Sequence, residues 1–357
     1  MIQTGRTIPP ANATQAIKLA GAAYPTKVPL LASSTHIWVP VAALIAGFIA
    51  LIWSADRFLA GAASTATNLG VSKMLIGLTI VSVGTSAPEI LVALAAALED
   101  NPLLAVGNAI GSNIANIGLV LGVTALIAPL PFSQAVLRKE LPWLIGATVG
   151  ALLLLFDLEL SAFDGLLLLS ALGAIFYRLV TNRERATDEI HHNLANELEE
   201  IPQMTTGQAA TWLVVGLAVL LASAELLVWA ASTIADRLGV NDIIIGLTIV
   251  AIGTSLPELA ATVGSALKGH TDIAIGNVVG SNILNILAVL CVPGLVNTTY
   301  IESVSLWRDC GMMLALTLML ALFAYAVNSR QYITRFEGAV MLSAWIGYNM
   351  LLVQQAL

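Results

Sequence analysis

The chain has 357 residues, of which 58% are hydrophobic and only 10% are charged, and its formal net charge is −7. A soluble domain has about 45 to 50% apolar and about a quarter charged residues, so this composition excludes an ordinary soluble protein. The apolar composition predicts the lipid bilayer as a partner. Because the chain carries no basic patch, we expect no nucleic-acid partner.

Residues 1–36 come first and form a polar tail that contains several prolines. They lack the compact apolar stretch after positive charges that marks a cleaved signal peptide. We therefore expect the membrane part of the chain to begin at about residue 37.

Ten apolar segments follow the tail, most of them close to the roughly 20 residues that cross about 30 Å of hydrocarbon as a helix. They cover 37–68, 74–98, 103–128, 141–157, 161–181, 207–238, 243–267, 272–296, 306–327 and 335–356. The expected fold is an all-α polytopic membrane protein with ten transmembrane helices.

Two blocks of sequence occur twice, on the second and third segments of each half. GLTIVSVGTSAPEI at 77–90 matches GLTIVAIGTSLPEL at 246–259, and AVGNAIGSNIANI at 105–117 matches AIGNVVGSNILNI at 274–286. The offset is the same in both blocks, since 258 − 89 = 169 and 285 − 116 = 169. The predicted organisation is a tail (1–36), a first five-helix repeat (37–181), an acidic cytoplasmic linker (182–206) and a second five-helix repeat (207–357).

An odd number of crossings in each repeat inserts the second copy upside down relative to the first. Such inverted repeats build many secondary transporters, whose binding site lies at the repeat interface near the middle of the membrane. We therefore expect two inverted five-helix repeats.

Lys and Arg residues orient the spans, because cytoplasmic loops carry an excess of them. With the tail outside, the inner loops hold Lys73, Arg138, Lys139, Arg178, Arg183, Arg185, Lys268, Arg330 and Arg335, and the outer loops hold Arg237 and Arg308. Three basic residues of the tail argue the other way. We expect a multi-pass protein of the cell's inner (plasma) membrane with both termini outside.

Each GTS-x-PE motif places a carboxylate inside a membrane segment, where ionisable groups are costly and usually functional. Thr85 and Ser86 precede Glu89 by four and three residues, so on a helix both hydroxyls lie beside the carboxylate. The second repeat carries the same set as Thr254, Ser255 and Glu258. Oxygen ligands without sulfur or imidazole are the chemistry of hard cations such as Na+ and Ca2+.

Prolines next to both acids predict a break in the helix. Pro88 and Pro257 have no backbone N–H, so they release the carbonyls of Gly84 and Gly253. Within a membrane such freed groups must be satisfied by protein or water, and a bound cation could satisfy them.

The second block offers further oxygen ligands. Ser112 and Asn116 are four residues apart and share a helical face, as do Ser281 and Asn285. An amide oxygen completes a coordination shell without adding charge. Two ionised glutamates give the site a charge of about −2, which one Ca2+ or two Na+ would balance.

Some of these residues also have a structural interpretation. Gly107 with Gly111, and Gly276 with Gly280, are small residues four apart that permit close helix contact. A buried Glu can be a structural hydrogen-bonding group, although its duplication in matched settings favours a functional role.

Other polar and sulfur-containing residues carry weaker signals. Asp56 and Glu225 align at the same offset, 225 − 56 = 169, and both a structural pair and a role in the ion entry path stay open for them. Cys291 and Cys310 read as small apolar residues rather than a disulfide or redox pair. The histidines and acids of the linker read as a solvated segment rather than a metal sensor.

At the duplicated motifs the chain resembles the cation/calcium antiporter superfamily, and specifically the prokaryotic branch of the sodium/calcium exchanger family. The resemblance rests on GTS-x-PE and GN-x-x-GSN-x-x-N, each present twice, and extends to the ten-helix plan from about residue 37 onward. It implies the sodium/calcium exchanger fold and makes Glu89 and Glu258 the central cation ligands. It further implies oxygen ligands from Thr85, Ser86, Ser112, Asn116, Thr254, Ser255 and Ser281, with backbone carbonyls near Ser82 and Ala251 assisting.

The chain departs from the family pattern at one ligand position. Some archaeal and potassium-dependent relatives carry Asp where this chain has Asn285. The site therefore has one ionisable carboxyl group fewer than in those relatives, which leaves the ion ratio and any K+ requirement open. The linker also has no room for the large regulatory calcium-binding domains of the family.

The predicted function is a secondary active antiporter, not an enzyme, that extrudes Ca2+ in exchange for Na+ by alternating access. It uses no cofactor, Ca2+ and Na+ are its substrates, and a monomer suffices for transport. An alternative is an antiporter of H+ and Ca2+ or another divalent cation, in which the same glutamates bind protons.

An intramembrane hydrolase is disfavoured because no GxGD-type segment, HExxH motif or GxSxG with a partner His occurs. A passive channel would be distinguished by its much larger conductance.

Overall fold

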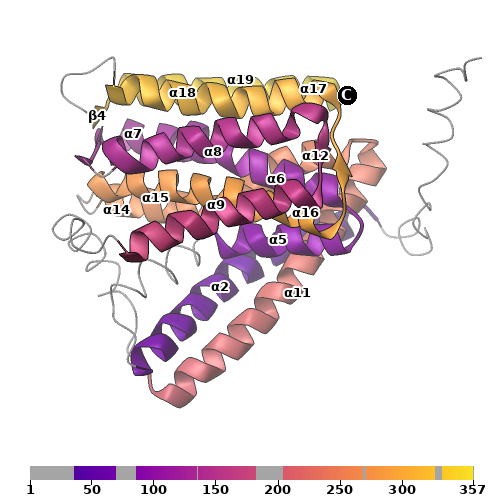
Figure 1. Cartoon of the computed structure of the whole chain (residues 1–357). Coiled ribbons are helices and arrows are strands. Elements are labelled where there is room, and N and C mark those ends of the chain that lie inside the picture. Colours follow the sequence, from indigo (N-terminus) through magenta and orange to yellow (C-terminus); the bar gives the residue numbers. More distant parts are fainter. Residues whose placement is uncertain are drawn as a thin grey trace, which may run out of the picture. The chain divides into compact units, whose positions relative to one another are not determined.

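The structure is a computed structural model that describes residues 36–69, 86–134, 136–181, 204–267, 271–325 and 332–356. From Trp38 onward the described residues belong to one compact unit. Within this unit the structure is almost entirely helical (Figure 1).

The first half begins with one long helix and continues with shorter helices, several of which follow one another directly. Its elements are α2 (Trp38–Asn68), α5 (Ala87–Leu98), α6 (Pro102–Ala115), the π-helical turn η2 (Asn116–Leu121), α7 (Gly122–Ile127), η3 (Val136–Glu140), α8 (Leu141–Leu154), η4 (Leu155–Asp157) and α9 (Ala162–Thr181). Two short strands, β1 (Leu130–Pro131) and β2 (Glu159–Leu160), lie in its connections.

The second half repeats this order. Its helices are α11 (Thr206–Leu238), α12 (Asp242–Ile245), η6 (Gly246–Val250), α13 (Ala251–Thr254), α14 (Leu256–Leu267), α15 (Thr271–Leu284), η7 (Asn285–Val289), α16 (Cys291–Val296), α17 (Ser303–Ser305), η8 (Leu306–Cys310), α18 (Gly311–Tyr325) and α19 (Arg335–Ala356). Its strands are β3 (Thr299–Tyr300) and β4 (Tyr332–Ile333).

Seven helical runs in the described part of the chain are long and apolar enough to cross a membrane. The number rises to eight if the bent pair Asp242–Thr254 and Leu256–Leu267 forms one span. Of the remaining expected segments, α9 has 20 residues, and α5 has 12 and follows residues outside the described ranges. The all-α membrane architecture is confirmed. It stays a prediction that there are ten spans and that the second five-helix repeat is inverted relative to the first.

The fourth helical run of each half begins earlier than its apolar segment predicted. Helical structure starts at Val136 and at Ser303 because the turns η3 and η8 continue directly into α8 and α18. Arg138, Lys139 and Arg308 therefore lie on helical turns, although we assigned them to loops. Polar residues at a span end do not stop a helix, so the apolar pattern alone places such a boundary too late.

The connections of the two halves pair with each other. β1 pairs antiparallel with β4, with Leu130 opposite Ile333, and β2 pairs with β3, with Leu160 opposite Thr299. At the repeat offset β1 corresponds to β3, since 299 − 130 = 169. Each small sheet thus takes one strand from each half, so the two halves are interleaved.

The last helix of each half packs against the third helical run of the other half. α19 lies on α7, where a Cβ on Gly338 would lie 2.7 Å from the Ala125 Cβ. α9 lies on α16, where a Cβ on Gly165 would lie 2.9 Å from the Cys291 carbonyl oxygen. Glycine at both positions lets the helices approach this closely, because any side chain would push them apart.

Both last helices begin with the same side-chain cap. Asp164 accepts hydrogen bonds from the Ser161 N–H at 2.8 Å and hydroxyl at 2.6 Å. Glu337 accepts from the Thr334 N–H at 2.6 Å and hydroxyl at 2.9 Å. The caps are equivalent in the two halves, since 337 − 164 = 173 and 334 − 161 = 173, and a carboxylate near a helix N-terminus is also favoured by the helix dipole.

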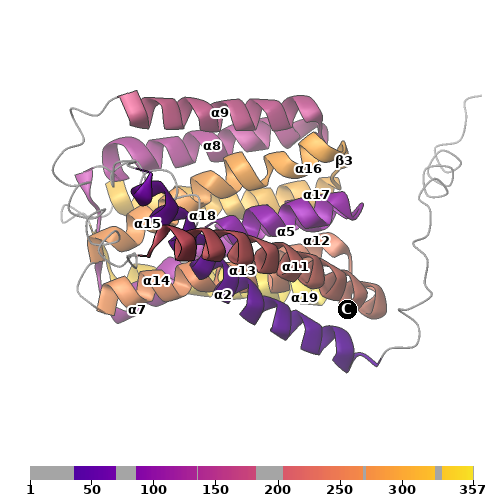
Figure 2. The same cartoon turned by 90° about the horizontal axis from the view of Figure 1, so that it is seen from below.

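The long helices α2 and α11 lie side by side in both views and pack most extensively against each other (Figures 1 and 2). Glycines make this contact close, because a Cβ on Gly61 would lie 2.5 Å from the Leu213 backbone nitrogen. α2 also reaches the second half through Phe48, whose ring occupies the space where a Cβ on Gly253 would stand.

The predicted close contact of the duplicated glycines is confirmed for the first half. A Cβ on Gly107 would lie 2.4 Å from the Ile243 carbonyl oxygen, and one on Gly111 would lie 2.7 Å from the Leu247 Cα. α6 therefore packs directly on the backbone of α12 and η6. For Gly276 and Gly280 the contact stays a prediction, because the equivalent of α12 and η6 lies outside the described residues.

Candidate functional site

The predicted break beside Glu258 is present in the structure. α13 ends at Thr254 and α14 begins at Leu256, with a bend of 41° between the two helical arms. Pro257 occupies the first turn of α14. Backbone N–H groups there have no partner within the helix, so the missing N–H of proline costs no hydrogen bond. In the first half α5 begins directly after Ser86, with Pro88 in the same place.

This local fold places each acid in the first turn of a helix, Glu89 in α5 and Glu258 in α14. A helix N-terminus carries unpaired N–H groups and a partial positive charge of about half an elementary charge. Both helices therefore favour a negative charge on these carboxylates at a place that water does not reach.

The two glutamates are fully buried and belong to one centre. Glu89 is 0% exposed and Glu258 is 1% exposed. Their carboxyl groups are close enough to interact electrostatically, and Glu89 also lies beside the Thr254 hydroxyl. The structure thus brings together two acids that are 169 positions apart in the chain, since 258 − 89 = 169.

The other predicted ligands are also buried wherever the structure describes them. They are Ser86, Ser112, Asn116, Thr254, Ser255, Ser281 and Asn285. Thr85 and Ser82 lie outside the described residues. The Ala251 carbonyl accepts hydrogen bonds from the Thr254 hydroxyl at 3.3 Å and the Ser255 N–H at 3.1 Å, so it is engaged within its own half.

A chain of hydrogen bonds crosses from one half to the other at this centre. The Asn108 amide donates to the Glu89 backbone carbonyl at 3.3 Å, and the Thr254 hydroxyl donates to the Asn108 side-chain oxygen at 3.1 Å. The hydroxyls of Ser112 and Thr254 lie 3.4 Å apart. The backbone of the first acid helix is therefore linked to the break in the second.

A further bond joins two equivalent residues of the halves. The Asn282 amide donates to the Asn113 backbone carbonyl at 3.3 Å, and these positions differ by the repeat offset of 169. This bond links the two copies of the GN-x-x-GSN block.

Several buried polar atoms on the elements that carry or contact the two acid-bearing helices have no hydrogen-bond partner among the described residues. Among the described residues they include both carboxyl oxygens of Glu89 and Glu258, the hydroxyls of Ser86, Ser255 and Ser281, and the amide atoms of Asn116 and Asn285. An unsatisfied buried polar group costs about 1 to 3 kcal/mol. The two carboxyl groups and the neighbouring hydroxyl and amide oxygens form a donor set that suits a positively charged partner.

The composition of this centre restricts the kind of partner. Within the described ranges no three His, Cys, Asp or Glu side chains gather at one place. The donor set consists of two carboxylates with hydroxyl and amide oxygens. This set fits a hard cation bound through oxygen and does not fit a thiophilic metal.

The turns that carry the two asparagines are π-helical. η2 begins at Asn116 and η7 begins at Asn285, and such turns are frequent at functional sites. α14 packs against η2 and α5 packs against η7. Each acid-bearing helix therefore meets the Asn-bearing turn of the opposite half, a cross-packing that the sequence pattern did not reveal.

Four more buried polar residues belong to this region and were missed as candidates: Asn108, Asn113, Asn282 and Thr262. The three asparagines carried a signal, because each lies inside a duplicated motif. Thr262 lies four residues after Glu258 on α14, a spacing that puts both on one helical face, but its first-half equivalent is Ala93.

Other candidates lie outside the centre. Asp56 and Glu225 are exposed on α2 and α11, so the choice between a structural pair and an entry-path role stays open. Cys291 and Cys310 are both buried and free, and their assignment as apolar residues without a redox role stays a prediction.

A further buried acid has a different environment. Asp309 in η8 is 0% exposed and accepts hydrogen bonds from the Arg308 guanidinium at 2.5 and 2.9 Å. The Tyr348 hydroxyl of α19 donates to it at 2.8 Å, and Arg308 also bonds to Gln355. Its charge is compensated within the protein.

The fold and the centre together define a class of protein: an all-α multi-span membrane protein in which two related halves share a buried, acidic, oxygen-rich centre. The family model described as "Sodium/calcium exchanger protein" matches residues 39–180 and 208–354. The chain belongs to this family of membrane transporters, and the predicted resemblance is confirmed.

Individual relatives agree with this assignment. The chain is 46% identical over 309 residues to the "Putative antiporter CaxA" of Alkalimonas amylolytica, a match that covers 87% of this chain and 97% of the relative. It is 39% identical to the "Inner membrane protein YrbG" of Escherichia coli, with 80% and 88% covered. It is 31% identical to the "Sodium/calcium exchanger MaX1" of Methanosarcina acetivorans, with 87% and 97% covered.

A solved structure shares the fold. The sodium-calcium exchanger NCX_Mj, soaked with 100 mM Na+ and 10 mM Sr2+, has a TM-score of 0.57 and 33% sequence identity, with 87% of this chain and 97% of that chain covered. This similarity supports the all-α membrane fold described above.

Proposed function

We propose that this protein is a secondary active antiporter that exchanges Na+ for Ca2+ across the membrane by alternating access. The observation that carries the proposal is the buried centre at Glu89 and Glu258, where two acids and their neighbouring oxygens have no partner among the described residues. Membership of the exchanger family supports the same function.

In this proposal the cargo supplies the missing positive charge. Glu89 and Glu258 are the central ligands, and Thr85, Ser86, Ser112, Asn116, Thr254, Ser255, Ser281 and Asn285 contribute hydroxyl or amide oxygens. One Ca2+ or two Na+ neutralise the two carboxylates. Both cargoes compete for overlapping oxygens, so they do not occupy the centre together.

Coupling follows from the cost of an empty site. Two unpaired carboxylates in a low-dielectric interior are penalised by several kcal/mol each when they are sealed from water. The empty protein therefore resists closing over the site, and either cargo removes the penalty. Exchange requires no covalent chemistry.

The pair α2 and α11 forms the moving part in this proposal. The two helices pack most extensively against each other, and α2 covers the break in the second half through Phe48 at Gly253. A shift of the pair across the core would open the centre to one side and then to the other. We place both termini on the outer side, in keeping with the distribution of basic loops.

The decisive experiment measures Na+-driven uptake of radiolabelled Ca2+ into proteoliposomes. Glu89→Gln and Glu258→Gln should each abolish exchange, because a neutral amide cannot balance the cation. Glu302→Gln is the matched control, since Glu302 is exposed and lies before α17. Full exchange in either site variant would overturn the proposal.

The same assay separates Na+ from H+ coupling. Both ions could bind the two carboxylates, so separately imposed Na+ and H+ gradients are needed. If a pH gradient drives Ca2+ uptake in Na+-free buffer, the coupling ion is H+ rather than Na+. The proposed binding site stays the same in that case. A single-channel current in planar bilayers would instead indicate a passive pore.

A further inference from the structure

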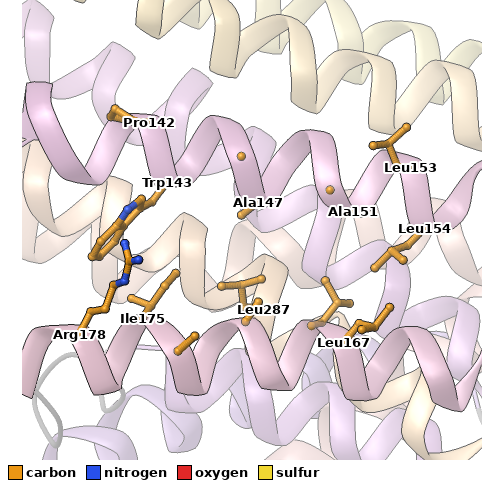
Figure 3. Close-up of a pocket in the computed structure, with 15 residues that line it drawn as sticks. Pro142, Trp143, Ala147, Ala151, Leu153, Leu154, Leu167, Ile175, Arg178 and Leu287 are labelled. Carbon is orange, nitrogen blue, oxygen red and sulfur yellow. The ribbon is translucent and has the colours of Figure 1, made fainter.

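A cavity of about 650 Å³ lies between α8 and α9 (Figure 3). Its walls are apolar residues of both helices, including Leu167 and Ile175, and Leu287 of η7 forms its floor (Figure 3). α8 belongs to a run that is long and apolar enough to cross the membrane, so this groove lies at the depth of the lipid.

The groove exists because α8 and α9 make little direct contact with each other. α8 packs on α15, α18 and η7, and α9 packs on α16 and η7. Gly146 and Gly150 line the gap on α8, and a Cβ on either would meet no described heavy atom within 4 Å. An unfilled gap of this size forfeits the dispersion contacts of its lining, so an apolar occupant is favoured.

In the second half a hydrogen bond joins α19 to η8, the turn that corresponds to η3. Tyr348 on α19 reaches Asp309 there, and the first-half residue at the equivalent position is Ile175, since 348 − 175 = 173. The capping residues Asp164 and Glu337 are related by the same offset, since 337 − 164 = 173. Ile175 has no hydroxyl to bridge the two helices, and it lines the groove instead.

The two ends of the groove differ in charge. At one end Arg178 of α9 and Trp143 of α8 point toward each other (Figure 3). The exposed Arg138 and Lys139 lie on η3 close to this end, and the partly buried Glu140 stands between them and α8. The connection at the opposite end carries acids such as Asp157. A basic end with a tryptophan is typical of the membrane interface, and it complements an anionic headgroup.

The length of the groove matches one leaflet of a bilayer. From Trp143 to Leu154 the helix advances 11 residues, since 154 − 143 = 11, which is about 16 Å at 1.5 Å per residue. This is about half of the roughly 30 Å hydrocarbon core. A single acyl chain that starts at the basic end would therefore end near the other end of the groove.

We infer that the groove between α8 and α9 is a binding site for one anionic phospholipid. Its headgroup lies at Arg178 and Trp143, and one acyl chain runs along Gly146 and Gly150 over Leu287. Because Leu287 belongs to the same π-helical turn as Asn285, the bound lipid also supports the turn that carries a candidate cation ligand.

Native mass spectrometry of the purified full-length chain in detergent, titrated with dioleoyl phosphatidylglycerol or dioleoyl phosphatidylcholine, tests this inference. We expect one tightly retained lipid, with phosphatidylglycerol preferred about fivefold, the ratio that about 1 kcal/mol from one basic side chain gives. Arg178→Gln should remove the preference and keep the binding. Arg335→Gln, at an exposed arginine of α19, is its matched control.

Filling the groove tests the position of the chain. Gly150→Leu and Gly146→Leu should each weaken binding of both lipids at least about tenfold by occupying the gap. Gly173→Leu is the matched control, because Gly173 is exposed on α9 and also has no described atom within 4 Å of a Cβ, but it does not line the groove. Two groove variants are used so that the loss of one through misfolding leaves the test intact.

Three results would overturn the inference. These are equal retention of the two lipids by the unmodified chain, unchanged lipid binding in both groove variants, and a stable dimer that either groove variant dissociates. The last result would show that a second copy of this chain, and not a lipid, covers the groove.

Discussion

Two buried acidic centres of this protein compensate their negative charge in different ways. Asp309 is paired with Arg308 and accepts a further bond from Tyr348. Glu89 and Glu258 are equally buried, but their carboxyl oxygens have no partner among the described residues. The first centre carries its own cation, whereas in the proposed function the second receives its cation from outside.

In the proposed function this difference separates a structural acid from acids that bind the transported ion. A buried charge with a built-in partner holds two helices together whatever ions are present, and here it joins η8 to α19. A buried charge pair without a partner makes the stability and the conformation of the protein depend on the bound ion. Burial alone does not distinguish the two centres, and the compensating partner does.

The largest expected effect concerns the centre with its own cation. Asp309→Asn leaves Arg308, whose side chain is 13% exposed, without a counter-charge. Breaking a fully buried pair costs about 3 to 5 kcal/mol, and the partial exposure of Arg308 places the loss at the lower end of this range. The unfolding free energy, measured by SDS titration in mixed micelles, should fall by about 3 kcal/mol. Stabilisation by Ca2+ should persist, and its loss would show that the two centres are not independent.

The second effect concerns stabilisation by the cargo. A ligand at 100 times its dissociation constant stabilises the folded state by about 2.7 kcal/mol, so Ca2+ should raise the melting temperature of the unmodified chain. Glu258→Gln should abolish this rise and, without Ca2+, melt no lower than the unmodified chain, because it removes an unpaired charge. A Ca2+-dependent rise that survives in Glu258→Gln would place the cation elsewhere.

A third variant sharpens the description of the Asp309 centre. Tyr348→Phe removes one hydrogen bond to a charged group and keeps the Arg308 pair, so we expect a loss of about 1.5 kcal/mol. SDS titration measures it directly, with Tyr177→Phe at an exposed tyrosine of α9 as the control. Equal losses in the two variants would mean that the Tyr348 hydroxyl contributes nothing specific.

The smallest effect tests a neutral oxygen of the transport centre. Thr254→Val removes the hydroxyl that bonds Asn108 and lies near Ser112. Loss of one neutral hydrogen-bonding group is worth about 1 kcal/mol, so the Ca2+ concentration for half-maximal exchange should rise about fivefold. Thr254→Ser should restore the affinity, and a Ser variant as weak as Val would assign the effect to packing instead.

The sequence singled out the two buried acids Glu89 and Glu258 because each lies in a long duplicated motif. It also predicted the break at Pro257 and the close contact at Gly107, since a missing N–H and a missing side chain act locally. The Asp309 centre could not be predicted in the same way. Its partner Tyr348 is 39 positions away, and neither residue belongs to a repeated block.

Local pattern thus determined the membrane class, the position of most helices and the residue types at the candidate site. Only the tertiary structure decided that β1 pairs with β4, that each acid helix meets the Asn-bearing turn of the other half, and that a gap between α8 and α9 stays open. These features depend on contacts between segments far apart in the chain. Apolar periodicity and motif spacing report how a segment folds, and they contain no information about which distant segment it will pack against.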